Sequence, residues 1–333
     1  MVGKLFILFV FFVPTISVSA EGLFYFFNNK NGLNDFKKNY EKIDVVAPQI
    51  YEVEQDLSIS KPLNKKIISE AKRKSVPTMP LIVQDKFDKV LMSTILIAPS
   101  AQDRIIDFMI KEAKKQKYIG WQFDFENINH LDRDMYSDFV AKTYKKMKEN
   151  NLQFSVAVIV RDRDYDRNSK NQDWSSAYDY KKLAANSDFL SLMTYDDPRT
   201  EGPVASIPYV NRILNYITKL ASAEKLSLGI PFYCYVWQDG KKIGAATYEI
   251  AEKNYKKAKK GKLRGFDEKY GAEFFKYVKD KKETTVWCDN EQSFKLKQEI
   301  ISERGMCGYS VWALGQGDKK IWLGINNIIA KSN

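Results

Sequence analysis

Two carboxylates at the end of an apolar segment have the types and spacing that acid–base chemistry needs. The segment reads Gly120-Trp121-Gln122-Phe123-Asp124-Phe125-Glu126-Asn127. Side chains alternate faces along a β-strand, so Gln122, Asp124 and Glu126 point to one side, and the two carboxylates lie about 6–7 Å apart. When two carboxylates lie close together in a sheltered site, their repulsion raises the pKa of one of them, and this carboxyl group then keeps its proton near neutral pH. Cleavage of a glycosidic bond uses such a pair.

The scarcity of histidine and cysteine excludes several other chemistries. The 333 residues include one histidine, His130, and three cysteines. A Ser-His-Asp or Cys-His hydrolase would need His130 itself as its base, and metal sites rich in histidine cannot be built from one imidazole. We therefore expect a carboxylate-based reaction with no metal and no cofactor.

Short apolar segments alternate with longer charged segments along the chain, and this alternation predicts the strands and helices that position the two carboxylates. Eight segments are rich in β-branched and aromatic residues: Leu23–Phe27, Val45–Tyr51, Thr78–Val83, Trp121–Phe125, Phe154–Val160, Phe189–Tyr195, Leu226–Pro231 and Gly308–Leu314. Strands separated by helix-length connections are typical of parallel βαβ units, and eight of them favour a closed (β/α)8 TIM barrel over an open sheet. Active sites of such barrels lie at the C-terminal ends of the strands, which is where Asp124 and Glu126 fall.

One connection is too long for a single loop and helix. Pro231 ends the seventh predicted strand and Gly308 begins the eighth, so we expect a small α+β insertion between them, at about residues 239–285. Residues 239–283 hold 14 Lys and Arg against 8 Asp and Glu, a surplus that is more than half of the chain's net charge of +11. This surplus fits either a solvated lysine-rich surface or a surface that holds an anionic partner. We treat residues 21–333 as one barrel with this insertion.

The first twenty residues, MVGKLFILFVFFVPTISVSA, have the pattern of a cleaved signal peptide. One lysine precedes an apolar run from Leu5 to Val13, and small residues end the segment. The run is shorter than the roughly 20 residues that a membrane span needs, which makes an anchored form the weaker alternative. We expect residues 1–20 to be removed, the mature chain to begin near Glu21, and the protein to be secreted or periplasmic.

The cysteines allow at most one disulfide. Their odd number leaves at least one thiol unpaired among Cys234, Cys288 and Cys307. The spacing of the three residues does not choose the pair.

Four motifs in order along the chain resemble glycoside hydrolase family 18, the chitinase-like barrels. The fourth strand of that family carries D-x-x-D-x-D-x-E, whose last Asp and Glu match Asp124 and Glu126, while the two earlier acidic positions fall on Ile119 and Gln122. The other three motifs are Met193-Thr194-Tyr195-Asp196, Leu228-Gly229-Ile230-Pro231-Phe232-Tyr233 and Gly308-Tyr309-Ser310-Val311-Trp312. The four motifs lie between Ile119 and Trp312.

The branch of spore-germination and cortex-lytic N-acetylglucosaminidases resembles this chain most. Three segments of this chain carry the resemblance to that branch: Asp124-Phe125-Glu126-Asn127, Asp132-Arg133 and Gly202-Pro203-Val204-Ala205. That branch also tolerates an amide at the position of Gln122. The resemblance leaves the polymer open between chitin oligomers, peptidoglycan glycan and N-glycans.

The resemblance implies a substrate-assisted reaction, in which the 2-acetamido oxygen of the sugar attacks the anomeric carbon. Glu126 would protonate the leaving oxygen and later deprotonate water. Asp124 would hold the acetamido nitrogen as positive charge grows there, and Tyr195 would donate a hydrogen bond to the acetamido oxygen. The candidate substrate-binding residues are Gln122, Met193, Asp196, Tyr233 and Trp312, the last by stacking on the sugar.

These observations predict a secreted glycoside hydrolase that cleaves β-linked N-acetylglucosamine polymers with retention of configuration. The alternative is a carbohydrate-binding protein on a chitinase-like barrel that has lost turnover. Gln122 favours that alternative, and Glu126, whose loss usually marks such non-enzymes, argues against it. Nucleic acid is not expected as a partner, because the lysines cluster in the insertion and we expect the chain to be exported. The oligomeric state is not predicted.

Overall fold

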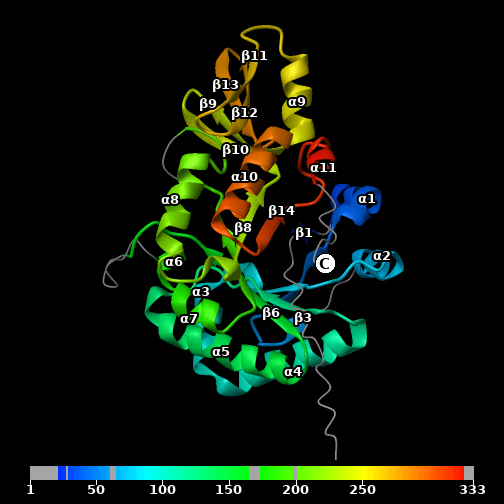
Figure 1. Ribbon diagram of the computed structural model, residues 1–333, viewed down its shortest axis with the longest axis vertical. Helices are drawn as coiled ribbons and strands as arrows, with labels where there is room; N and C mark the ends of the chain where they lie inside the picture. Colours follow the sequence, from blue (N-terminus) through cyan, green and yellow to red (C-terminus); the bar gives the residue numbers. More distant parts are fainter. Residues whose placement is uncertain (1–21, 28, 61–64, 165–172, 198–200, 326–333) are drawn as a thin grey trace, which may run out of the picture.

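Eight parallel strands close into a barrel in the computed structural model, which describes residues 22–27, 29–60, 65–164, 173–197 and 201–325 (Figure 1). The strands are β1 (Gly22–Phe26), β2 (Val45–Val53), β4 (Leu81–Gln84), β5 (Gly120–Phe123), β6 (Gln153–Ile159), β7 (Phe189–Met193), β8 (Leu226–Pro231) and β14 (Gly308–Trp312). They pair in the order β1-β14-β8-β7-β6-β5-β4-β2, and β2 pairs back to β1 to close the ring. The predicted (β/α)8 TIM barrel is confirmed. The predicted signal peptide lies outside the described residues.

Helices cover the outside of the barrel and connect successive strands. They are α1 (Lys30–Asn39), α2 (Lys66–Lys74), α3 (Lys89–Ile97), α4 (Pro99–Gln116), α5 (Arg133–Glu149), α6 (Asp173–Ser176), α7 (Tyr180–Ala185), α8 (Ile207–Ile217), α10 (Glu291–Arg304) and α11 (Ile321–Gly324). Short 3-10 turns lie at Tyr40–Lys42, Asp85–Phe87, His130–Asp132 and Ala223–Lys225. No helix within the described residues is both long and apolar enough to cross a membrane.

The alternation of side chains along the strands builds two apolar layers. In β1, Leu23 and Tyr25 point into the barrel, where they pack with residues such as Leu81. Phe24 and Phe26 point outward into the larger core between the strands and the helices. All four β1 side chains are buried, as expected for a parallel sheet that is covered on both faces.

The carboxylates follow a strand that is shorter than predicted. The strand β5 ends at Phe123 and not at Phe125. The amide of Asp124 still donates to the carbonyl of Ile82 at 3.0 Å, which extends the pairing with β4 by one residue. The carbonyl of Phe125 instead accepts the hydroxyl of Tyr178 at 2.8 Å, because the chain has turned away from the sheet.

The insertion is a five-stranded antiparallel sheet with one helix. It comprises β9 (Tyr233–Gln238), β10 (Lys241–Thr247), α9 (Tyr248–Lys257), β11 (Leu263–Asp267), β12 (Ala272–Lys279) and β13 (Lys282–Cys288), in the sheet order β10-β9-β13-β12-β11. It extends a few residues beyond the expected range of 239–285 at each end. Figure 1 shows this subdomain projecting from one end of the barrel, beyond β8 and β14. A two-residue strand, β3 (Ile59–Ser60), pairs with the end of β2.

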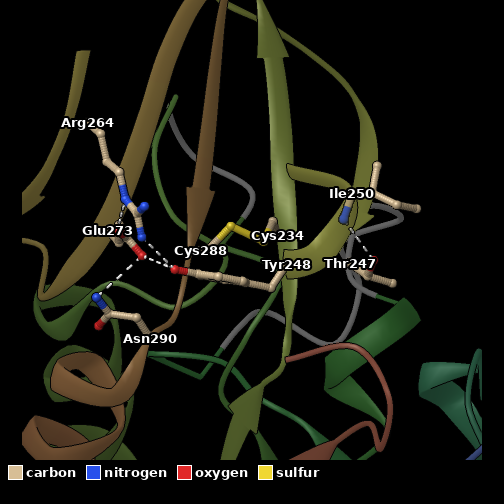
Figure 2. Close-up of a disulfide and its surroundings, with 8 residues drawn as sticks. All are labelled: Cys234, Thr247, Tyr248, Ile250, Arg264, Glu273, Cys288 and Asn290. Atoms are coloured by element: carbon tan, nitrogen blue, oxygen red, sulfur yellow. Dashed lines mark hydrogen bonds and ion pairs between the residues drawn. A yellow bond between two sulfur atoms is a disulfide. The ribbon is translucent and has the colours of Figure 1, made fainter. Parts of the chain in front are cut away.

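A disulfide between Cys234 and Cys288 joins β9 to β13 at the base of the subdomain (Figure 2). Both cysteines are buried, and Cys307 is a free thiol. Beside the disulfide, the carboxylate of Glu273 accepts hydrogen bonds from the hydroxyl of Tyr248 at 2.7 Å and the guanidinium of Arg264 at 2.6 Å. These links hold the helix and strands of the subdomain together close to its junction with the barrel.

Candidate active site

Asp124 and Glu126 lie at the C-terminal mouth of the barrel, directly after β5. Asp124 is almost fully buried, with 3% of its surface exposed, and Glu126 is half-buried. The side-chain amide of Gln84, at the end of β4, holds the backbone of Glu126 from both sides. Its Nε2 donates to the carbonyl of Glu126, and its Oε1 accepts the amide of Glu126 at 3.3 Å. The backbone that carries the second carboxylate is therefore fixed to the neighbouring strand.

The residue after Glu126 turns the chain sharply. Asn127 has a φ of 51°, in the left-handed region that asparagine tolerates better than most residues. Its side-chain amide donates to the carbonyl of Phe87 at 3.1 Å, which ties this turn to the loop after β4. Such anchoring holds the Glu126 carboxyl in a fixed position, which proton transfer to or from a reacting atom requires.

Burial raises the pKa of both carboxyl groups, and nearby negative charge raises the pKa of Glu126 further. The low-dielectric surroundings disfavour the charge of Asp124, and this desolvation raises its pKa. Desolvation also raises the pKa of Glu126, and the negative charges of Asp124 and Asp196 raise it further. One group of the pair is therefore protonated near neutral pH, as the spacing predicts.

Gln122 lies beneath these carboxylates in the barrel interior. It is fully buried, and its Oε1 accepts the hydroxyl of Tyr25 at 2.8 Å. Its Nε2 donates to the hydroxyls of Ser155 and Ser191, each at 2.9 Å. Its side-chain amide is therefore engaged by three hydroxyls, and these bonds support the strand end that carries Asp124. The assignment of Gln122 as a substrate-binding residue stays a prediction.

Tyr195 follows β7 and faces the two carboxylates. The negative charges of both contribute, after burial, to raising the pKa of its hydroxyl well above the usual value, so the hydroxyl stays protonated and can donate a hydrogen bond. Its ring approaches β8 closely at Gly229. A Cβ at that position would fall 2.1 Å from the carbonyl of Leu192 and 2.9 Å from the Tyr195 ring, so only glycine leaves room.

Asp196 organises two tyrosines of the insertion. Its Oδ1 accepts the hydroxyl of Tyr233 at 2.5 Å and also the hydroxyl of Tyr235. Tyr233 begins β9 and does not end a barrel strand, and Tyr235 is two residues further along the same face. Tyr235 is not among the site residues predicted from the sequence, although this period of two indicates it.

A groove of about 840 Å³ extends from Asp196 along the insertion. Its lining residues include Tyr233, Tyr235, Trp312, Gln316, Lys242 and the small residues of β10. Trp312 is half-buried at the end of β14, with its ring centroid 5.2 Å from that of Tyr25. Met193 is half-buried at the end of β7. Among the candidates for substrate binding, Asp196, Tyr233 and Trp312 thus line one groove.

The comparisons with known proteins bear on this arrangement. Residues 25–317 match the family model described as glycosyl hydrolases family 18. The chain belongs to family 18. The resemblance drawn from the four motifs is confirmed, and the protein is a family 18 glycosidase.

Relatives of this family 18 chain include bacterial glycosylases. The uncharacterized glycosylase YvbX of Bacillus subtilis is 32% identical over 307 residues, which are 88% of this chain and 86% of that protein. The cortical fragment-lytic enzyme of Bacillus subtilis is 24% identical over 262 residues, which are 74% of this chain and 58% of that protein. Both relatives are Bacillus subtilis proteins, and the likeness to them does not assign the polymer of this chain.

Two solved structures share the fold of this family 18 chain. The spore cortex-lytic enzyme SleL of Bacillus megaterium superposes with a TM-score of 0.80 at 26% identity and covers 92% of this chain and 73% of its own. A chitinase of Chromobacterium violaceum superposes with a TM-score of 0.82 at 22% identity and covers 94% of this chain and 99% of its own. The likeness to the chitinase, at 22% identity, shows a shared fold and no more.

Proposed function

We propose that the protein is a secreted enzyme that hydrolyses β-linked N-acetylglucosamine polymers with retention of configuration. The observation that carries the proposal is the pair of carboxyl groups at the mouth of a family 18 barrel, the buried Asp124 and the half-buried Glu126, whose pKa values are both raised. A carboxylic acid that keeps its proton near neutral pH can protonate a leaving glycosidic oxygen. The relatives named cortical fragment-lytic enzyme and spore cortex-lytic enzyme support a polymer of this class.

Glu126 is the proton donor of the proposed reaction. It is less buried than Asp124, so a substrate at the mouth of the barrel can reach it, and burial together with the charges of Asp124 and Asp196 raises its pKa. After the leaving group departs, the same carboxylate accepts a proton from water, as microscopic reversibility requires.

Asp124 and Tyr195 act on the acetamido group of the substrate in this proposal. The attacking acetamido oxygen closes a five-membered ring on the anomeric carbon, and the nitrogen becomes positive as it does so. The charged form of Asp124 stabilises that nitrogen once Glu126 holds the proton of the pair. The protonated hydroxyl of Tyr195 donates to the acetamido oxygen and orients it.

The variant Glu126→Gln tests the proposed acid. The amide keeps the shape of the side chain but has no proton to transfer, so turnover of N-acetylglucosamine oligosaccharides should fall by about 10²–10⁴. Binding of the same oligosaccharide, measured by calorimetry, should persist. A variant that keeps full activity would place the acid elsewhere.

The anomeric form of the product tests the substrate-assisted mechanism. Proton NMR of early products should show the β configuration at the new reducing end. A polymer with free amines at the cleavage subsite has no acetamido oxygen and should not be cleaved. Inverted products, or equal cleavage of de-acetylated chitin, would contradict the mechanism.

A carbohydrate-binding protein without turnover is the second candidate, and Gln122 favours it. A carboxylate at this position could exchange a proton with Asp124, which the amide of Gln122 cannot do. Incubating the mature protein with chitin oligomers and peptidoglycan glycan, and weighing the products, distinguishes the two candidates. Oligosaccharide binding without any cleavage would establish the second.

Secretion is part of the proposal and depends on the N-terminal segment. Removal of residues 1–20 would leave a chain that begins at Glu21. Mass spectrometry of the exported protein reads this directly. An intact Met1 on a membrane-bound form would refute the proposed processing.

A further inference from the structure

Five lysines line a hollow of about 610 Å³ at the outer end of the inserted subdomain. We call it the lysine hollow, and its lysines are Lys257, Lys259, Lys260, Lys279 and Lys281. The first three come from the end of α9 and the residues after it, and the other two from the end of β12 and the turn that follows. All five are exposed, and Figure 1 shows these segments far from the barrel helices α4 and α5.

The backbone holds the two lysine-bearing segments side by side. The amide of Val278 donates to the carbonyl of Lys260 at 3.0 Å, which joins the loop after α9 to β12. Beneath this contact the rings of Tyr255 and Tyr277 pack edge to face, with centroids 6.4 Å apart. The positions from which the lysine side chains project are therefore fixed by packing, although the side chains themselves are solvated.

The charge of the lysine hollow is not balanced by nearby acids. Within the described residues none of its five lysines forms an ion pair, and its single acidic lining residue is Asp280. Lys256, one residue before the hollow, does pair with Glu252 at 2.9 Å. The helix dipole of α9 favours a cation in the last helical turn, which accounts for Lys257 but not for the other four. Five like charges around one hollow repel one another and create a field that attracts anions.

We infer that the lysine hollow binds an acidic polysaccharide, one whose sugars carry carboxylates, and so anchors the enzyme to its polymer. The choice of a polysaccharide rests on the proposed function, whereas the choice of an anion rests on the five lysines. A nucleic acid fits less well, because the aromatic residue that lines the hollow, Tyr277, is only 4% exposed and offers no face on which bases could stack.

The position of the hollow explains what such an anchor would do. The strands β9 and β10 of the subdomain line the groove beside Asp196, and its opposite parts, the end of α9 and the β12–β13 turn, line the hollow. Because the Cys234–Cys288 disulfide and the sheet tie these parts together, a chain held in the hollow stays near the groove. Binding at one site then raises the effective concentration of polymer at the other.

Binding to polygalacturonate, a carboxylate-bearing polysaccharide, tests the inference. The mature protein with Glu126→Gln is used, so the measurement does not depend on turnover. Replacing Lys259, Lys260 and Lys279 together by Gln should weaken binding by about tenfold or more at low salt. Added salt should weaken the binding of the parent protein steeply, since exposed charges are screened over about 10 Å at 0.1 M.

A matched control separates the hollow from net charge. Replacing Lys111, Lys115 and Lys145 by Gln removes the same charge from exposed positions on α4 and α5, and it should change binding by less than about twofold. Equal weakening of binding by both triple variants would overturn the inference. Tighter binding of single-stranded DNA than of polygalacturonate, or equal binding of a neutral glycan and of polygalacturonate, would overturn it as well.

The failure of this inference and the failure of the proposed function are distinguishable. With Glu126 restored, the triple lysine variant should cleave a short soluble N-acetylglucosamine oligosaccharide with unchanged kcat/KM, because that substrate does not reach the hollow. Absence of cleavage by the parent protein would contradict the proposed function and leave the binding result as it stands. Loss of cleavage in the triple variant alone would overturn the anchoring role.

Discussion

The substitution Asp196→Asn isolates the charge of one groove residue from its hydrogen bonds. A single oxygen, Oδ1 of Asp196, accepts both tyrosine hydroxyls, those of Tyr233 and Tyr235. An asparagine oxygen can accept the same two bonds. Because Asp196 is exposed, the new amide hydrogens can face water. The variant should therefore keep the geometry of the groove and remove only the negative charge.

The lost charge should lower the pKa of Glu126. Desolvation and Asp124 raise this pKa most, and Asp196 raises it further. Water screens the charge of the exposed Asp196, so its interaction with Glu126 is weaker than that between two buried charges. Since about 1.36 kcal/mol corresponds to one pKa unit, we expect the pKa of Glu126 to fall by about one unit or less.

The sign of the effect on activity follows from the role of Glu126. An acid catalyst is active while protonated, so kcat/KM declines as the pH rises through its pKa. A lower pKa moves this basic limb to lower pH, and the activity at pH 8 should fall several-fold more than the activity at pH 5. The assay is kcat/KM for a fluorogenic N-acetylglucosamine disaccharide between pH 4 and 9.

The variant Tyr235→Phe is the matched control. It removes one hydroxyl that donates to Asp196 but leaves the negative charge in place, so the basic limb should not move to lower pH. The reasoning would be refuted if Asp196→Asn lowered kcat/KM equally at every pH. Asp196 would then act by positioning the tyrosines and not by its charge.

Three further predictions concern other parts of the molecule. Gln122→Asp should move the acid limb of the pH–rate profile to higher pH, because a second buried carboxylate beside Asp124 makes ionisation harder; an unmoved limb would show that the glutamine only fills space. Replacing Cys234 and Cys288 together by alanine should lower the free energy of unfolding, measured with denaturant, by about 4 kcal/mol for a loop of this length; a loss below about 1 kcal/mol would contradict the loop-entropy estimate. Lys297 of α10 forms a buried ion pair with Asp289. The variant Lys297→Met should lower the free energy of unfolding by about 3–5 kcal/mol, because it leaves the buried charge of Asp289 unpaired, and adding Asp289→Leu should restore most of the loss.

The sequence by itself determined the barrel and the place of its chemistry. The period-two alternation around Asp124 and Glu126 places both carboxylates at one strand end, and eight apolar segments separated by helix-length connections predict the closed sheet. These patterns are local, because they depend only on which neighbouring residues suit a pleated strand or an amphipathic helix. They can therefore be recognised in the sequence alone. The strand bounds were less accurate, since hydrogen bonding and not composition ends a strand, as at Phe123.

Only the tertiary structure decided which distant residues support the site. Gln84 is 42 residues from Glu126, Tyr25 is 97 residues from Gln122, and neither contact has a counterpart in a local pattern. The same holds for the choice of Cys234 and Cys288 as the disulfide pair, and for the gathering of lysines from α9 and from the β12–β13 turn around one hollow. Closing a barrel brings strand ends together in an order that depends on sheet register and on the packing of the insertion. Those are properties of the whole chain, and residue spacing does not encode them.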